Sequence, residues 1–168
     1  EMRTGVTLEL VRQRLVERGR VGDHGTTPEL PAEVHAVARS RGRELSRRAG
    51  VLVALFEEDG ETHVILTRRS FDLRTHKGEV SFPGGRSDEG ESPADAALRE
   101  AHEEIGLAPG EATLAGILTP IATFASGSAI WPVIAVLPSR PTLTPDPREV
   151  DRVFTVALKD LLADGAFL

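Results

Sequence analysis

The chain has 168 residues, of which 40% are hydrophobic and 27% are charged, and this balance suits one compact domain with its own core. Cysteine is absent, which excludes disulfide frameworks, thiolate metal sites and cysteine nucleophiles. The formal net charge of −6 argues against a nucleic-acid-binding surface, and no apolar run is long enough to span a bilayer, so we expect a cytoplasmic protein with neither nucleic acid nor membrane as a partner.

Residues 1–47 are predicted to form an N-terminal helical extension. Residues 7–18 (TLELVRQRLVER) carry a threonine cap and the spacing of apolar residues that is typical of a short amphipathic helix. After a loop rich in Gly, Thr and Pro, residues 31–46 (PAEVHAVARSRGRELS) predict a second helix. We consider three roles for this extension: a cap on the core, a dimerisation arm that would make the protein a homodimer, and a partial lid.

A β-hairpin is predicted directly after the extension. Residues 51–57 (VLVALFE) and 63–68 (HVILTR) are rich in β-branched and apolar residues, and Asp59-Gly60 between them is a turn pair. Further on, the sequence predicts short strands over 79–82, 112–123, 130–137 and 150–158, a loop over 142–148 and a last helix over 159–164. Pro132 lacks a backbone N–H, so we expect an edge strand or a bulge there.

One helix is predicted between these two groups of strands, and its ends are well defined. Ser92 is a good N-cap, Pro93 suits the first helical position, Asp95 stands where a capping carboxylate would, and Gly106 favours a left-handed end. About thirteen helical residues lie between these ends. Strands on both sides of one central helix indicate an α/β layered domain with a mixed sheet.

The two faces of this helix differ in character. At 100° per residue, an apolar stripe is formed by Ala94, Leu98, Ala101 and Ile105, and a separate face gathers the carboxylates of Glu100, Glu103 and Glu104. Like charges at these spacings cost a few tenths of a kcal/mol per pair. The acidic face is therefore either solvated surface or the binding site of a cation, for which carboxylate oxygens favour Mg²⁺ or Mn²⁺.

The residues around this helix resemble the Nudix box. The box has the pattern G-x5-E-x7-R-E-U-x-E-E-x-G-U, where U is aliphatic. Here it runs from Gly85 through Glu91 and Arg99-Glu100 to Gly106-Leu107. Ala101 is a small residue at one of the aliphatic positions. The resemblance implies the α/β/α sandwich of Nudix hydrolases over residues 48–168, preceded by the helical extension. It also implies a nucleoside diphosphate derivative as substrate.

The resemblance further implies roles for individual residues. Glu100 and Glu104 are the expected metal ligands, Glu103 is a ligand or the general base, and the Gly85 carbonyl is an additional oxygen. Glu149, in the late loop, is the other candidate for the general base. An ion pair between Glu91 and Arg99 is expected to fix the loop to the helix rather than to contact substrate.

A second motif precedes the box and resembles the signature of the coenzyme A pyrophosphatase branch. It reads Leu66-Thr67-x-Arg69-Ser70-x3-Arg74-x3-Gly78-x3-Phe82-Pro83-Gly84-Gly85 and departs from the signature at one position, where Ile65 replaces Leu. Coenzyme A carries a ribose 3′-phosphate, so extra cationic donors are expected near the nucleotide. The candidates are Arg68, Arg69, Arg74, His76 and Lys77, unless they pair with acidic neighbours.

Together the two motifs predict a Mg²⁺- or Mn²⁺-dependent hydrolase. The expected substrate is coenzyme A or a derivative, and the expected products are 3′,5′-ADP and 4′-phosphopantetheine. Two alternatives stay open: a pyrophosphatase for ADP-ribose, NADH or dinucleoside polyphosphates, and a non-catalytic ligand sensor built on the same domain.

Overall fold

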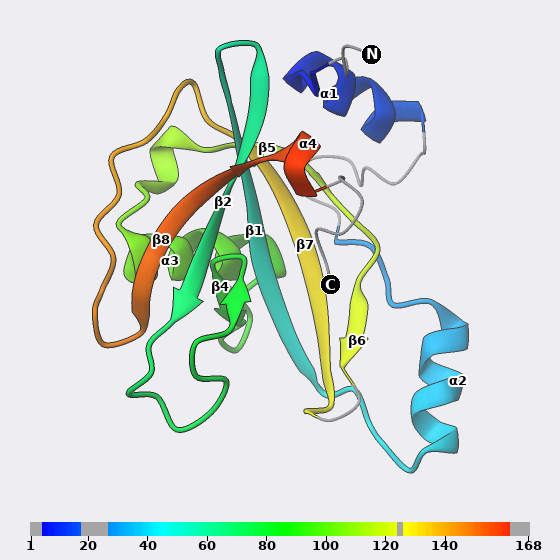
Figure 1. The fold of residues 1–168 in the computed structure, drawn as a ribbon. Coiled ribbons are helices and arrows are strands. Elements are labelled where there is room, and N and C mark those ends of the chain that lie inside the picture. Colours follow the sequence, from blue (N-terminus) through cyan, green and yellow to red (C-terminus); the bar gives the residue numbers. More distant parts are fainter. Residues whose placement is uncertain (1–4, 18–26, 124–125, 162–168) are drawn as a thin grey trace.

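We describe the protein from a computed structural model, which covers residues 5–17, 27–123 and 126–161. One eight-stranded mixed sheet organises the chain (Figure 1). Its main path runs β3-β2-β1-β7-β5, and β4, β6 and β8 pair with β1, β7 and β2. The strands are β1 (Arg47–Glu58), β2 (Glu61–Arg69), β3 (Val80–Ser81), β4 (Gly84–Arg86), β5 (Thr113–Ile117), β6 (Ile121–Thr123), β7 (Ser128–Val136) and β8 (Val150–Ala157).

The central pair β1 and β7 is parallel, and every other pair is antiparallel. The helices are α1 (Leu8–Glu17), α2 (Ala32–Ser40), α3 (Pro93–Ile105) and α4 (Leu158–Leu161), with a 3₁₀ turn η1 (Pro109–Glu111) after α3. None of the helices in the described ranges is long and apolar enough to cross a membrane.

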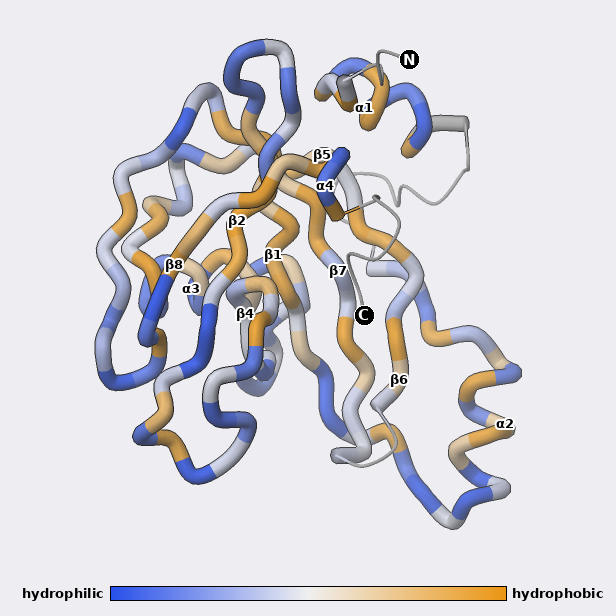
Figure 2. Tube along the Cα trace, viewed as in Figure 1, coloured by the Kyte–Doolittle hydropathy of each residue, from blue (hydrophilic) through white to orange (hydrophobic). Residues whose placement is uncertain are grey.

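Helices cover both faces of the sheet. On one face, α3 buries its apolar side against β1 and β7 in a core that includes Leu52, Phe56 and Trp131. On the other face, residues of α1 and α4 pack against a smaller cluster around Leu55 and Val64. Figure 2 shows hydrophobic residues along the central strands and hydrophilic residues in the connecting loops. The predicted α/β/α sandwich with a mixed sheet is confirmed.

The second helix is shorter than predicted. It ends at Ser40 instead of Ser46 because Gly42 takes a left-handed conformation, with φ of 64°, which stops the helix. The chain then extends into β1, which begins at Arg47 instead of Val51. Ala38 is the one buried residue of α2, so this helix lies at the periphery of the fold.

The stretch over 112–123, predicted as one strand, forms the two strands β5 and β6. The break between them explains how a proline is accommodated at position 132 of β7. Of the two alternatives predicted at Pro132, an edge strand or a bulge, the edge strand is wrong, because β7 pairs with β1 on one side and with β5 and β6 on the other. Pro132 lies between the stretches that pair with β5 and β6, and its carbonyl accepts from Leu118 N at 2.9 Å. The missing N–H of Pro132 points to this same side, where the sheet is already interrupted.

Gly50 in β1 allows the close approach of α3 to the sheet. A Cβ atom at this position would lie 1.8 Å from the carbonyl oxygen of Pro93, in the first turn of α3. Backbone atoms cannot move aside as a flexible side chain would. The position of the helix, and of the carboxylates that it carries, therefore depends on the absence of a side chain at Gly50.

We predict that Gly50→Ala destabilises the protein by about 2–4 kcal/mol, because it forces the helix away from the sheet. Gly110→Ala is the matched control, since a Cβ at Gly110 would meet no atom within 4 Å. Its effect should stay within about 0.5 kcal/mol. Equal midpoints for the two variants in urea denaturation would show that α3 does not rely on this contact.

Candidate active site

The α3 helix has the ends that the sequence predicts. Ser92 Oγ accepts a hydrogen bond from Asp95 N at 3.1 Å, Pro93 starts the helix, and Gly106 ends it with φ of 70°. The apolar side of the helix is shifted from the predicted stripe. Ala97 is fully buried, whereas Leu98 is only partly buried. This shift brings Glu104 to the edge of the core, where the residue is 7% exposed.

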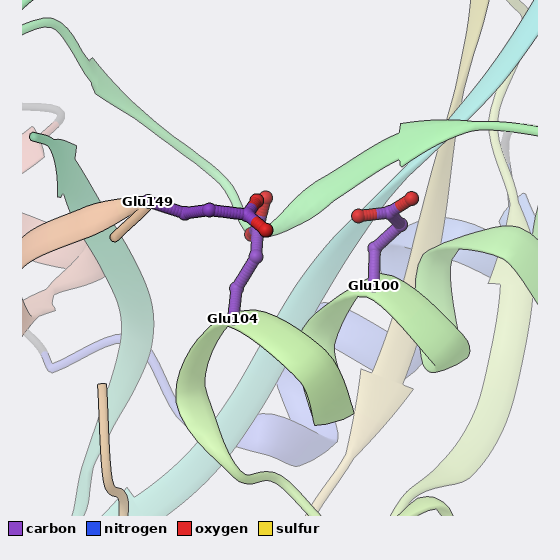
Figure 3. A group of neighbouring side chains, drawn as sticks. All are labelled: Glu100, Glu104 and Glu149. Atoms are coloured by element: carbon purple, nitrogen blue, oxygen red, sulfur yellow. The ribbon is translucent and has the colours of Figure 1, made fainter. Parts of the chain in front are cut away.

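Three carboxylates meet beside α3. One oxygen from each of Glu100, Glu104 and Glu149 lies within 4.8 Å of the others, and the three side chains converge in Figure 3. Glu100 and Glu104 come from successive turns of α3, and Glu149 comes from the loop that precedes β8. We call this set the carboxylate group.

Backbone hydrogen bonds hold the Glu149 loop against the helix. Asp146 N donates to Glu104 O at 2.8 Å, and Glu149 N donates to Asp146 O at 3.0 Å. Glu149 O in turn accepts from Ser70 N at 2.9 Å. The loop is therefore tied on one side to α3 and on the other to the segment that follows β2.

Burial makes two of these carboxyl groups hard to ionise. It raises the pKa of Glu104 to about 7, and the nearby charges of Glu100 and Glu149 add to this rise. A hydrogen bond from Gly84 N to Glu104 Oε2 at 3.3 Å and the charge of Arg69 act in the opposite direction. Burial also raises the pKa of Glu100, although its hydrogen bond to Arg99 lowers it.

The carboxylate group fits a hard divalent cation. Carboxylate oxygens are the ligands that Mg²⁺ and Mn²⁺ prefer, and a cation would stabilise the ionised form of Glu104, which burial and the neighbouring carboxylates disfavour. Gly85 leaves room for Glu100 in this arrangement. A Cβ at Gly85 would lie 2.6 Å from the carboxyl carbon of Glu100. Gly85 therefore lies beside Glu100, and a role of its carbonyl oxygen in metal binding stays a prediction.

Glu103 lies outside the carboxylate group. Its side chain is 53% exposed, and its Oε2 is 3.3 Å from Arg99 Nη1. The structure therefore brings Glu100 and Glu104 together but not Glu103, whose role as a metal ligand or general base stays a prediction. A residue one position before Glu104 on a helix points about 100° away from it, which turns Glu103 toward Arg99 and solvent.

Arg99 joins the box loop to the helix. Its Nε and Nη2 donate to the two oxygens of Glu91 at 2.9 and 3.0 Å, so the predicted ion pair is present and bidentate. Nη2 also donates to Arg86 O at 3.0 Å, and Nη1 donates to Glu100 Oε1 at 2.9 Å. The bond to Arg99 lowers the pKa of Glu91. Arg99 thus also orients one member of the carboxylate group.

The basic residues predicted to bind substrate have different surroundings. Arg69 lies close enough to Glu104 to lower its pKa, and the buried Nε of Arg69 has no hydrogen-bond partner among the described residues. Arg68 pairs with Asp151, and His76 Nδ1 lies 3.0 Å from Glu79 Oε2.

The side chains of Arg74 and Lys77 are exposed on the loop over 70–78. Of the five basic candidates, the structure brings Arg69 to the carboxylate group and engages Arg68 and His76 with acidic neighbours.

One contributor to the site was not predicted from the sequence. The backbone N–H of Gly84 reaches the Glu104 carboxylate, because β4 pairs with β1 and passes over α3. The Pro83-Gly84-Gly85 segment is the sequence feature that could have indicated this contact, because paired glycines often mark a close approach of the backbone. A Cβ at Gly84 would lie 2.3 Å from Gly50 O. Only glycine allows the backbone to approach so closely.

Comparisons with known proteins agree on one family. The family model described as the NUDIX domain matches residues 46–167. Nudix hydrolase 15, mitochondrial, of Arabidopsis thaliana is 43% identical over 124 residues, which are 70% of this chain and 42% of that protein. The Nudix hydrolase NudL of Pectobacterium atrosepticum is 37% identical over 118 residues, 70% of this chain and 60% of that protein. The chain thus spans about half the length of these relatives.

A solved structure supports the same assignment at the level of the fold. The crystal structure of RenU, a Nudix hydrolase from M. smegmatis, superposes with a TM-score of 0.59 at 24% identity. The match covers 71% of this chain and 77% of RenU.

We predict that Glu91→Gln lowers the stability of the protein by about 1–2 kcal/mol, because it breaks a bidentate, partly buried ion pair. Thermal unfolding followed by circular dichroism measures this change. Glu89→Gln, an exposed acidic neighbour in the same loop, is the control and should shift stability by less than about 0.5 kcal/mol. An unchanged melting temperature together with lost activity for Glu91→Gln would assign Glu91 to substrate or metal binding instead.

We also predict that Mg²⁺ raises the melting temperature more at about pH 8 than at about pH 5.5. The folded-state pKa of Glu104 is raised from 4.5 to about 7, so without metal the protein loses stability as the pH rises through this window. At the higher pH a cation binds the ionised carboxylate, whereas at the lower pH it must displace a proton. Glu104→Gln should abolish this pH dependence, and an equal Mg²⁺ effect at both pH values in the wild type would contradict the assignment.

Proposed function

Because the chain belongs to the Nudix family, we propose that it is a metal-dependent pyrophosphatase that hydrolyses coenzyme A or its derivatives. The products would be 3′,5′-ADP and 4′-phosphopantetheine. The observation that carries the proposal is the carboxylate group, which couples two glutamates of the Nudix box with Glu149 from a distant loop. Hydrolysis of a diphosphate is the chemistry that this arrangement serves best.

A divalent cation supplies most of the electrostatic stabilisation in this class of reaction. Nudix hydrolases generally use Mg²⁺ or Mn²⁺, which when bound neutralises the charge of the diphosphate oxygens and lowers the pKa of water. Glu100, Glu104 and Glu149 are the residues of this chain that would hold it. The burial of Glu104 favours this role, since a buried carboxylate gains most from a nearby positive charge.

We assign the proton transfer to Glu149. Its carboxylate is exposed and lies within the carboxylate group, so it can accept a proton from a water molecule that attacks phosphorus. The P–O bond to the bridging oxygen then breaks, and the leaving phosphate takes the electron pair. Glu103 is less suited to this step, because its carboxylate lies outside the carboxylate group and is engaged by Arg99 at 3.3 Å.

Arg69 is suited to bind a diphosphate oxygen. Its Nε is buried, has no partner among the described residues and lies near Glu104. A buried guanidinium donor without a partner is costly, and a phosphate oxygen would satisfy it. This role differs from the one considered in the sequence analysis, where Arg69 was a candidate for the ribose 3′-phosphate.

The substrate is argued from the motif that precedes the box. ADP-ribose, NADH and dinucleoside polyphosphates also contain a diphosphate, so the carboxylate group would serve them equally well. The segment from Leu66 to Gly85 resembles the signature of the coenzyme A branch, and this resemblance favours coenzyme A. A non-catalytic sensor would not need the complete carboxylate group that this chain retains.

We predict that the purified protein hydrolyses coenzyme A in the presence of Mg²⁺ and that Glu104→Gln lowers kcat by about 10²- to 10⁴-fold. The products can be separated by liquid chromatography, with ADP-ribose tested in parallel. His102→Gln is the matched control, since His102 is an exposed neighbour on the same helix.

Faster hydrolysis of ADP-ribose than of coenzyme A would overturn the substrate but leave the reaction class intact. Near wild-type turnover by a folded Glu104→Gln variant would overturn the role of the carboxylate group.

A further inference from the structure

A cavity lies beside the first turn of α3 and outside the carboxylate group. Its volume is about 530 Å³, and three arginines line it: Arg47 and Arg48 from the start of β1, and Arg86 from the end of β4. The antiparallel pairing of these strands brings the arginines together. Ala49 lies opposite Arg86, and Ser87 N donates to Arg48 O at 2.9 Å.

The charges around this cavity leave a positive excess. Three acidic residues also line it, but Arg99 binds Glu91 and lies 3.8 Å from Asp88, so Glu89 is the acidic residue that remains. The guanidinium groups of Arg47 and Arg86 are exposed and make no hydrogen bond or ion pair with any residue that the structure describes. Several arginines without acidic partners around one cavity suit an anion.

Arg48 is held in position before any ligand binds. Its guanidinium carbon lies 4.9 Å from the centroid of the Trp131 ring. Trp131 is buried and its Nε1 donates to Pro28 O at 2.7 Å, so the ring itself is fixed. Stacking leaves the edge of the guanidinium free to donate hydrogen bonds. A pre-positioned donor loses little side-chain freedom when it binds an anion.

The cavity is connected to the carboxylate group through one residue. Arg99 donates to Arg86 O on the cavity side and to Glu100 Oε1 on the other side. Ser92, which lines the cavity, precedes Glu100 by eight residues, a distance of about 12 Å along the helix. One substrate molecule that carries a diphosphate and a further phosphate can therefore reach both places.

We propose that this cavity is a second anion subsite, which binds a phosphomonoester group of the substrate while the diphosphate lies at the carboxylate group. In coenzyme A this group is the ribose 3′-phosphate, so the inference rests on the proposed function. It differs from the prediction from the motif, in which the candidates for binding this phosphate are Arg68, Arg69, Arg74, His76 and Lys77. The subsite would separate coenzyme A from diphosphate substrates that lack the additional phosphate.

The test is equilibrium binding, so it does not depend on turnover. Isothermal titration calorimetry with adenosine 3′,5′-bisphosphate and adenosine 5′-monophosphate compares ligands that differ only in the 3′-phosphate. We expect the wild type to bind the bisphosphate at least about tenfold more tightly than the monophosphate. This factor lies at the lower end of the range for charge-assisted hydrogen bonds, because the arginines are exposed to solvent. The double variant Arg47→Gln/Arg86→Gln should lose this preference.

Two further variants sharpen the test. Arg12→Gln, on the exposed side of α1, removes one positive charge elsewhere and should keep the preference. Arg48→Lys keeps the charge but cannot form the planar fork, so it should retain only part of the preference. Circular dichroism shows whether each variant is folded, and Arg47 and Arg86 have no side-chain partners among the described residues whose loss would unfold the chain.

Three results would overturn the subsite: no preference in the wild type, an unchanged preference in the double variant, or a loss of preference only in Arg74→Gln. Hydrolysis of coenzyme A is measured in parallel on the wild type. If the wild type prefers the bisphosphate through these arginines but does not hydrolyse coenzyme A, the subsite stands and the proposed substrate fails. If it hydrolyses coenzyme A and the double variant keeps the preference, the substrate stands and the subsite fails.

Discussion

The site depends on carboxylates that repel one another at the edge of a hydrophobic core. Glu104 is nearly buried, and burial together with two neighbouring carboxylates raises its pKa to about 7. The fold holds this arrangement by rigid means, since α3 lies directly on Gly50 of β1 and backbone bonds fix the Glu149 loop to α3. The structure thus holds together carboxyl groups whose ionisation a cation would favour, and we interpret this as pre-organisation for metal binding.

Two arginines compensate this negative charge in different ways. Arg99 is bound to Glu91, Glu100 and Glu103, so it serves the structure of the box and orients Glu100. Arg69 approaches Glu104 but keeps a buried donor without a protein partner. The first arginine stabilises the site before substrate arrives, and the second is available to the substrate. The same residue type therefore has two roles, which the hydrogen-bond partners distinguish.

Local features were predictable from the sequence, and long-range features were not. The α3 helix was predicted with its correct ends, because Ser92 and Gly106 act through their own backbone. The interior position of Pro132 could not be predicted from the sequence. It depends on the break between β5 and β6, which arises only when the whole sheet is assembled. Glu149 was named as a candidate base, but its approach to Glu104 depends on a loop 45 positions away along the chain. The arginine cavity arises in the same way, from the pairing of β1 with β4.

We propose that the metal site consists of Glu100, Glu104 and Glu149, without Glu103. Electron paramagnetic resonance of Mn²⁺ measures the free ion directly and gives the affinity of the wild type, Glu149→Gln and Glu103→Gln. The two variants remove the same charge at sites close to α3. We predict that Glu149→Gln weakens Mn²⁺ binding by about tenfold or more and that Glu103→Gln changes it by less than about threefold. Weaker binding in Glu103→Gln than in Glu149→Gln would contradict the site as described.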